Sequence, residues 1–177
     1  TLEGGPALVH TGPFGNIAHG NSSVLGDLIG VRLGDHLVTE SGFGADCGAE
    51  KFFDIKCRKA GLKPDCVEIV ATIRALKMHG GVAKDDLKKE NVAALEKGFA
   101  NLERHINNLR RYDVPVIVSI NRFSTDTEAE LALLQRLCAT MSVECVLADH
   151  WAQGGAGAEE LARTMVRTIE AKPSDFH

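Results

Sequence analysis

Phe43 stands between two glycines, Gly42 and Gly44, in a loop that follows the short apolar run Leu37-Val38. This brief run, bounded by turn residues, predicts a buried strand, and Asp46 is expected to cap the helix that follows. Open α/β sheets bind ligands where their strands end, and an aromatic ring presented there suits stacking on a planar ligand. The alternative is an ordinary glycine-rich turn in which Phe43 fills the core.

Trp151 is the only tryptophan of the chain and is followed closely by the pair Gly154-Gly155. Stacking of an aromatic side chain on a flat heterocycle contributes roughly 1–3 kcal/mol per ring. Phe43 and Trp151 together would clamp a planar ring from both sides. The alternative is that Trp151 is a partly buried residue of an interface.

An Asn-Arg-x-x-x-Asp pattern, from Asn121 to Asp126, follows another apolar run. The amide of Asn121 offers both a donor and an acceptor, which complements the edge of a purine base. The pattern loosely resembles the base-recognising loop of P-loop nucleotide hydrolases. The alternative is a helix start capped by Ser124, Thr125 or Asp126, and both interpretations can hold together.

Arg74 and Lys77 follow a third apolar run and would supply positive charge to a phosphorylated ligand. Solvation at the surface is the equally plausible alternative for both. The seven histidines show neither H-x-H nor H-x-x-x-H spacing, so no metal site is expected. The five cysteines form no C-x-x-C pair, which favours reduced thiols.

Helical and strand patterns alternate along the chain, which predicts an α/β fold: a mostly parallel sheet flanked by helices in a three-layer core like that of P-loop hydrolases. Strands are expected over 36–39, 67–73, 116–120 and 145–148. Helices are expected over 24–33, 47–60 and 92–109, and two further helices include residues 131–141 and 161–169. Loops after parallel strands emerge at one edge of the sheet. The residues expected to meet there are Phe43, His79, Asn121, Phe123 and Trp151.

The 177 residues suffice for one core, so 1–177 is expected to form a single α/β domain. The formal net charge of −4, with scattered basic residues, argues against a nucleic-acid partner. No apolar run approaches the length of a membrane span, and no signal peptide is evident. A cytoplasmic location is expected. The phosphate-cradling motif G-x-x-x-x-G-K-S/T does not occur in this sequence.

Five stretches of the sequence resemble signatures of the formate–tetrahydrofolate ligase family, also called 10-formyltetrahydrofolate synthetases. The resemblance covers essentially the whole chain, and motifs of this length are highly specific. The stretches are Glu3–Gly20, Thr39–Arg58, Ala71–Gly81, Ile120–Glu128 and His150–Gly155.

This resemblance implies an ATP-dependent ligation of formate to tetrahydrofolate, giving 10-formyltetrahydrofolate through formyl phosphate. It implies formate, tetrahydrofolate and ATP with Mg as the small-molecule substrates, and a homo-oligomeric enzyme. The pterin ring would lie between Phe43 and Trp151. The Asn121 loop would lie near the nucleotide or the folate, and Asn121 is assigned to the nucleotide. No catalytic residue is assigned. The folate-binding residues implied are Gly42, Phe43, Gly44, Phe123, Leu147 and Trp151.

Members of the family are much longer than this chain and have their P-loop upstream of the matched region. The chain is therefore expected to be a fragment that is inactive alone, because it lacks the phosphate cradle. One alternative is a non-catalytic folate- or nucleotide-binding module. Another is an interaction domain whose glycine loops bind no ligand.

Overall fold

The computed structural model describes residue 1, residues 3–9 and residues 18–177. The chain forms two compact units, Thr1–Pro64 with Phe176–His177, and Asp65–Asp175. The expectation of one domain over 1–177 stays a prediction. In the described part of the chain, every helix is too short or too polar to cross a membrane.

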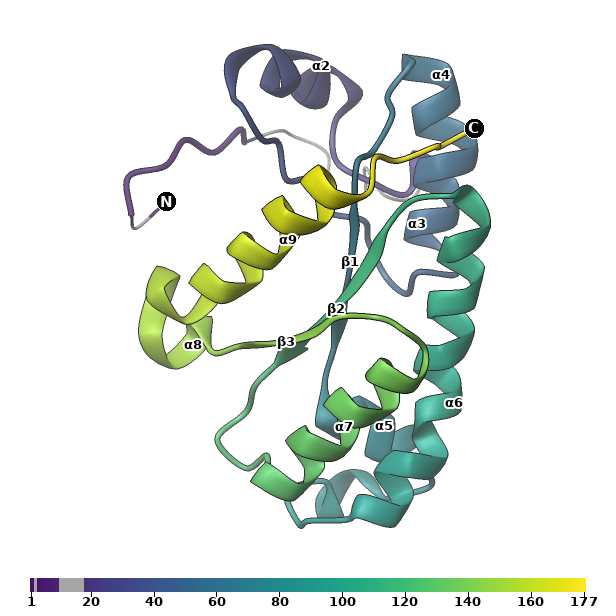
Figure 1. Cartoon of the computed structure of the whole chain (residues 1–177), viewed down its shortest axis with the longest axis vertical. Coiled ribbons are helices and arrows are strands. Elements are labelled where there is room, and N and C mark those ends of the chain that lie inside the picture. Colours follow the sequence, from purple (N-terminus) through teal and green to yellow (C-terminus); the bar gives the residue numbers. More distant parts are fainter. Residues whose placement is uncertain (2, 10–17) are drawn as a thin grey trace. The chain divides into compact units, whose positions relative to one another are not determined.

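A parallel sheet forms the centre of the second unit (Figure 1). Its strands are β1 (Val67–Ala71), β2 (Val116–Asn121) and β3 (Cys145–Ala148), in that spatial order. The interior residues of β2 are almost all apolar and buried, as parallel strands covered on both faces require. The predicted α/β fold with a parallel sheet flanked by helices is confirmed.

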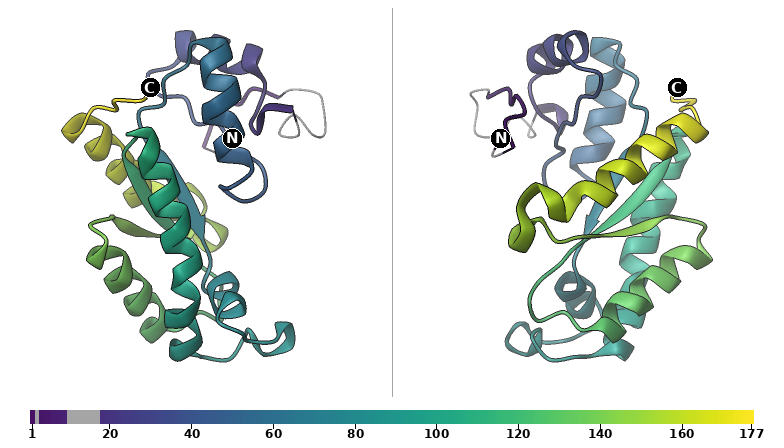
Figure 2. Two further views of the ribbon diagram at one scale, coloured as in Figure 1. Left: turned by 90° about the vertical axis from the view of Figure 1, so that its right-hand side faces the viewer. Right: turned by 60° about the vertical axis from the view of Figure 1, so that its left-hand side comes forward.

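Helices cover both faces of this sheet. Figure 2 shows α6 and α9 on opposite faces, and α7 packs beside α6, which gives the three layers expected from the sequence. The helices of the unit are α5 (Ile73–His79), α6 (Val92–Leu109), α7 (Glu128–Thr140), α8 (His150–Gln153) and α9 (Glu159–Ala171), with short 3₁₀ turns η2 (Lys84–Asp86), η3 (Arg110–Tyr112) and η4 (Gly154–Ala158).

The stripe of apolar residues on α6 packs inward with the period of an α-helix. Its buried members at intervals of three and four are Leu95, Phe99, Leu102, Ile106 and Leu109. A Cβ on Gly98 would overlap the carbonyl oxygen of Leu76. Helices α5 and α6 therefore approach backbone to backbone at this point, and only glycine permits it.

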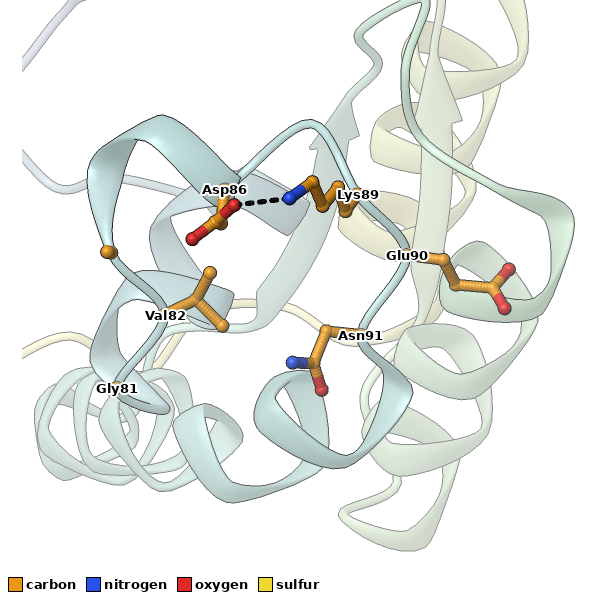
Figure 3. A pocket seen from close by; sticks show the side chains of 7 residues that line it. Gly81, Val82, Asp86, Lys89, Glu90 and Asn91 are labelled. Atoms are coloured by element: carbon orange, nitrogen blue, oxygen red, sulfur yellow. Dashed lines mark hydrogen bonds and ion pairs between the residues drawn. The ribbon is translucent and has the colours of Figure 1, made fainter.

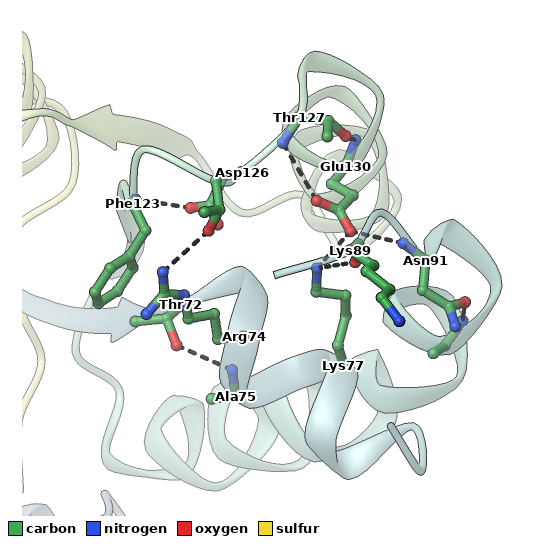
Figure 4. Close-up of polar contacts among 12 residues, drawn as sticks. Thr72, Arg74, Ala75, Lys77, Lys89, Asn91, Phe123, Asp126, Thr127 and Glu130 are labelled. Atoms are coloured by element: carbon green, nitrogen blue, oxygen red, sulfur yellow. Dashed lines mark hydrogen bonds and ion pairs between the residues drawn. The ribbon is translucent and has the colours of Figure 1, made fainter. Parts of the chain in front are cut away.

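A buried ion pair connects the last turn of α5 to the starts of α6 and α7 (Figure 4). Lys77 Nζ lies 2.8 Å from Glu130 Oε1, and both side chains are almost completely buried. The lysine also donates to the carbonyl oxygen of Lys89, at 2.8 Å. The carboxylate of Glu130 accepts from the backbone N–H of Asn91 at 2.9 Å and of Thr127 at 3.2 Å. These contacts link α5 to the first residues of α6 and α7.

Neither interpretation offered for Lys77 from the sequence is right, because the side chain is neither solvated at the surface nor free for a phosphate. The amphipathic pattern of a short helix does not reveal a carboxylate partner that comes from a distant segment. The predicted strand over 67–73 also ends early, at Ala71. Thr72 caps α5 by accepting from the N–H of Ala75 at 3.1 Å, so Ile73 begins a helix.

The first unit contains α2 (Val24–Leu33) and a continuous helical segment over 48–60. That segment consists of α3 (Gly48–Lys51), the π-helix η1 (Phe52–Cys57) and α4 (Arg58–Ala60). Both segments were predicted, but the π-helical turn was not.

The π-helix holds a buried lysine. Lys56 Nζ lies 2.6 Å from Asp27 Oδ2 and donates to Asn21 Oδ1 at 2.6 Å and to the carbonyl oxygen of Ser22 at 2.7 Å. Three acceptors satisfy all three N–H donors of the ammonium group, as burial of a charge demands. Thr39 joins this cluster by donating to Asn21 Oδ1 at 2.8 Å.

The strand predicted over 36–39 is wrong. Residues 36–40 form no strand, and the nearby pairing among the described residues is an isolated antiparallel bridge between Asn21 and Ser41. Val38 is 78% exposed, and Leu37 packs against Gly30 of α2, where a Cβ would overlap it. Two apolar residues are too few to specify a strand, and the cluster around Lys56 determines the path of this segment instead.

Loss of the buried cation should destabilise the chain strongly. Lys77→Met leaves the Glu130 carboxylate buried without its counter-charge, and we expect the free energy of unfolding to fall by about 3–5 kcal/mol in urea titrations at pH 7. Burial alone would raise the pKa of Glu130, but hydrogen bonds from Lys77, Asn91 and Thr127 hold it below the usual 4.5. The pair therefore stabilises above pH 4.5, and the difference between variant and wild type should shrink as the pH falls through the lowered pKa.

The matched control is Lys89→Met. Lys89 lies 2.7 Å from Asp86 Oδ1, but this lysine is 80% exposed, so its removal should leave the free energy of unfolding nearly unchanged. Equal losses for the two variants would contradict the account.

Candidate functional site

The loops that follow β2 and β3 lie side by side at the carboxyl edge of the sheet. The backbone N–H of Arg122 donates to the carbonyl oxygen of Ala148 at 3.1 Å. The guanidinium of Arg122 also lies 3.7 Å from the Asp149 carboxylate. Asn121 ends β2 in a half-buried position beside Ala148. This edge is therefore where side chains from different loops can act on one ligand.

The segment after β1 reaches the same edge through Arg74, in the first turn of α5 (Figure 4). Arg74 Nη2 donates to Thr125 Oγ1 at 3.0 Å. The carbon of its guanidinium lies 4.1 Å from the centre of the Phe123 ring, a cation–π contact. Arg74 thus covers part of Phe123 and holds the loop after β2. His79 lies at the other end of α5, about 9 Å along the helix from its start.

The loop over 121–127 contains a tight turn that two hydrogen bonds between Phe123 and Asp126 close. The N–H of Phe123 donates to Asp126 Oδ2 at 2.8 Å, and the N–H of Asp126 donates to the carbonyl oxygen of Phe123 at 3.0 Å. Helix α7 then begins with Thr127 as its cap, in a capping box with Glu130.

The caps predicted for this helix, Ser124, Thr125 and Asp126, are therefore wrong. The Asp126 carboxylate closes the preceding turn and is not free to cap the helix. The Thr-x-x-Glu spacing of Thr127 and Glu130 is a recognisable signal of a capping box, and it would have identified the start of α7.

Two buried polar atoms at this edge have no hydrogen-bond partner among the described residues: Asp126 Oδ1 and Arg74 Nε. Asp126 is only 8% exposed. Burial raises the pKa of its carboxyl group, although the hydrogen bond from Phe123 and the charges of Arg74 and Lys77 counteract the rise. A carboxylate kept dry with one free oxygen is costly and points to a missing partner.

Phe43 is presented to solvent by a strained backbone. Its φ of 63° is in the left-handed region, which a bulky residue rarely adopts, and 75% of the residue is exposed. The alternative that Phe43 fills the core is wrong. The loop before the helix is tight, because a Cβ on Gly48 would overlap the carbonyl oxygen of Gly42. The predicted cap by Asp46 is absent: Cys47 occupies the cap position without a side-chain hydrogen bond.

Trp151 projects from α8 and is 88% exposed. Its turn is held by Asp149, whose N–H donates to the carbonyl oxygen of Gly157 at 2.9 Å. A Cβ on Gly157 would overlap the Asp149 backbone, so this contact requires glycine. Leu147 is half-buried on β3. The predicted clamp pairs Phe43 of one unit with Trp151 of the other and stays a prediction.

An open pocket of about 540 Å³ lies elsewhere, at the connection between α5 and α6 (Figure 3). It contains none of the residues predicted to bind a ligand, and the Asp86–Lys89 ion pair on its wall satisfies those charges. Its lining residues are Gly81, Val82, Ala83, Asp86, Lys89, Glu90 and Asn91. We therefore place the candidate site at the carboxyl edge of the sheet and not here.

Within the described ranges, no group of three or more His, Cys, Asp or Glu side chains is arranged to hold a metal ion. The five cysteines are free thiols. Burial raises the pKa of Cys57 to about 12 and that of Cys66 to about 11. Neither of these two thiols is activated as a nucleophile, because the thiolate is the reactive form.

Comparison with known proteins gives one consistent result. The family model described as formate–tetrahydrofolate ligase matches residues 1–177. A formate–tetrahydrofolate ligase of Granulibacter bethesdensis is 63% identical over 176 residues, which cover 99% of this chain and 31% of that protein. The ligase of Methylobacterium nodulans is 63% identical over 171 residues (96% and 31%), and that of Methylorubrum extorquens PA1 62% over 179 residues (99% and 32%). The chain thus spans about a third of the length of these curated relatives.

Neutralising the buried carboxylate should stabilise the protein at neutral pH. In Asp126→Asn, the amide oxygen keeps the bond from the Phe123 N–H while the cost of burying a charge disappears. Because the folded pKa of Asp126 lies above the usual 3.8, the ionised wild type carries its full penalty only above that raised pKa. We expect the variant to be the more stable at pH 7, with the advantage vanishing as the pH falls toward 3.8, in urea titrations across that range.

Glu128→Gln provides the comparison, since Glu128 is a carboxylate of the same loop–helix junction with an 85% exposed side chain. Its effect should be small and nearly independent of pH. A lower stability of Asp126→Asn than of wild type at pH 7 would show that the charge is stabilising.

Proposed function

The chain belongs to the formate–tetrahydrofolate ligase family, and we propose that it forms the central α/β part of an enzyme that joins formate to tetrahydrofolate at the expense of ATP. The main support is identity of 62–63% to curated ligases over nearly the whole chain. The proposed reaction has two steps. Formate accepts the γ-phosphoryl group of ATP, giving formyl phosphate and ADP. N10 of the folate then attacks the formyl carbon, phosphate leaves, and the product is 10-formyltetrahydrofolate.

In this proposal the pterin ring stacks on Trp151, with Leu147 and Phe123 beside it. The exposure of Trp151 supports the role, because a solvent-exposed indole ring is available to a planar ligand. Such stacking contributes roughly 1–3 kcal/mol. Arg74 already lies against the Phe123 ring, so the ligand would contact the part of that ring that Arg74 leaves open.

Phe43, with the flanking Gly42 and Gly44, is proposed as the second folate-binding element. Its positive φ keeps the ring out of the core and in solvent. Strained residues of this kind concentrate at ligand sites, where binding offsets their cost. The loop packs closely on the helix that follows, because a Cβ on Gly48 would overlap the carbonyl oxygen of Gly42.

ATP is proposed to bind with Asn121 near its base and with Mg as part of the substrate. The 177 residues contain no G-x-x-x-x-G-K-S/T motif, so the phosphates need a cradle from outside this segment. We infer that the isolated chain does not catalyse formate-dependent turnover of ATP and that a longer protein containing it does. A non-catalytic folate- or nucleotide-binding module is the alternative that the missing motif leaves open.

We further propose a cytoplasmic homo-oligomer that acts on small molecules and has no nucleic-acid or membrane partner. The net charge of −4 supports the absence of a nucleic-acid partner.

The test is formation of 10-formyltetrahydrofolate by the complete ligase with Trp151→Ala. Loss of one stacked ring should raise the KM for tetrahydrofolate roughly 5- to 150-fold and leave the KM values for ATP and formate unchanged. Met78→Ala, which truncates another exposed apolar side chain (51% exposed), should change none of the three. An unchanged KM for tetrahydrofolate would remove Trp151 from the site, and formate-dependent ATP turnover by the isolated chain would contradict its predicted inactivity.

A further inference from the structure

The two unpartnered atoms at the carboxyl edge of the sheet are complementary in chemistry. Arg74 Nε can only donate a hydrogen bond, and the ionised Asp126 Oδ1 can only accept one. The other buried side-chain atoms without a partner among the described residues are Nδ1 of His19 and Nδ1 of His105. Of these four residues, only Arg74 and Asp126 come together at one place: Asp126 belongs to the loop that contains Phe123, and Arg74 of α5 packs against that loop (Figure 4).

Both side chains are held by their remaining contacts. Asp126 Oδ2 accepts from the Phe123 N–H at 2.8 Å, which fixes the carboxylate. Arg74 donates to Thr125 Oγ1 at 3.0 Å and lies over the Phe123 ring, which fixes the guanidinium. Neither group can turn to find another partner without losing one of these contacts. The free donor and the free acceptor are therefore preorganised.

We propose that Arg74 Nε and Asp126 Oδ1 together recognise the polar edge of a planar heterocycle, on which a hydrogen-bond acceptor stands next to an N–H donor. The inference rests on the proposed function, whose substrates supply two such edges. The pteridine ring of tetrahydrofolate has a carbonyl beside a ring N–H. Adenine has a ring nitrogen beside an amino group. Both would accept from Arg74 and donate to Asp126.

Other ligand parts fit these atoms poorly. A phosphate or a formate ion brings only acceptors and negative charge, and the Asp126 carboxylate would repel it. The surroundings also favour a flat ring, because the Phe123 ring and the Asn121 amide belong to the same short loop. The raised pKa of Asp126 agrees with a site that a ligand completes, since a bound N–H donor would restore the hydrogen bond that burial removed.

Asp126→Asn in the complete ligase tests the proposal. The amide oxygen preserves the bond from the Phe123 N–H, while an NH₂ donor replaces the free acceptor. We expect the dissociation constant of one substrate, tetrahydrofolate or ATP, to rise roughly 10- to 150-fold and that of the other to stay within about twofold. The affected substrate identifies the heterocycle. No change for either, as expected if a buried water is the partner, would overturn the proposal, and so would equal weakening of both.

Analogues with the reversed edge sharpen the result. A 4-amino analogue of tetrahydrofolate and inosine triphosphate each exchange the positions of donor and acceptor. Wild type should bind each natural substrate more tightly than its analogue. Asp126→Asn should lose most of this preference for the one substrate whose dissociation constant the variant raises, and should keep it for the other substrate. Retention of the full preference by the variant would overturn the proposal.

Arg74→Lys keeps the positive charge but removes Nε, and it should weaken the same substrate; it serves as the test if Asp126→Asn does not fold. Glu128→Gln, whose side chain is 85% exposed, is the matched control and should bind both substrates as wild type does. Activity of the wild-type ligase is measured separately. An active wild type with unaffected variants would reject this inference alone, whereas an inactive wild type would reject the proposed function.

Discussion

The buried pair of Lys77 and Glu130 is the constraint on which the candidate site depends. A charge in a protein interior is tolerated only when it is paired and hydrogen-bonded, and here one carboxylate serves a lysine of α5 and the backbone at the starts of α6 and α7. The loop that contains Phe123 and Asp126 runs from β2 to α7. Because the pair fixes the start of α7 and the sheet fixes the end of β2, both ends of this loop are immobilised.

The features with a cost in stability lie where a ligand is proposed to bind. Phe43 has a backbone conformation that its side chain disfavours, Asp126 buries a carboxylate with a free oxygen, and Trp151 leaves its ring in water. Elsewhere in the second unit the charges that are buried, such as that of Lys77, have their partners. Proteins concentrate such local conflicts at functional sites, and binding of a planar ligand would relieve those of Asp126 and Trp151.

The sequence predicts most of the fold because long periodic segments show which face is buried. The stripe on α6 and the apolar strand β2 are examples. Prediction from the sequence fails where a residue's main partner lies far away in the chain, or where the apolar run is only two residues long. Nothing near Lys77 reveals Glu130, and the Leu37-Val38 run resembles a strand although the cluster around Lys56 determines its path. For the site, Phe123 and Trp151 were selected because they follow apolar runs that are strands β2 and β3. Phe43 was selected from a strand that the structure lacks, and its exposure comes from its glycine-flanked turn. The unpartnered atoms of Arg74 and Asp126 depend on side-chain geometry that spacing does not specify.

The most direct test of the central claim, that this chain binds folate, is the fluorescence of its single tryptophan. The purified 177-residue chain would be titrated with tetrahydrofolate, with free N-acetyltryptophanamide as the control for light absorption by the ligand. Saturable quenching of Trp151 beyond that control, weakened in Phe43→Ala, is the predicted result. A folded chain, verified by circular dichroism, whose emission follows the free tryptophan control at every ligand concentration would contradict the claim.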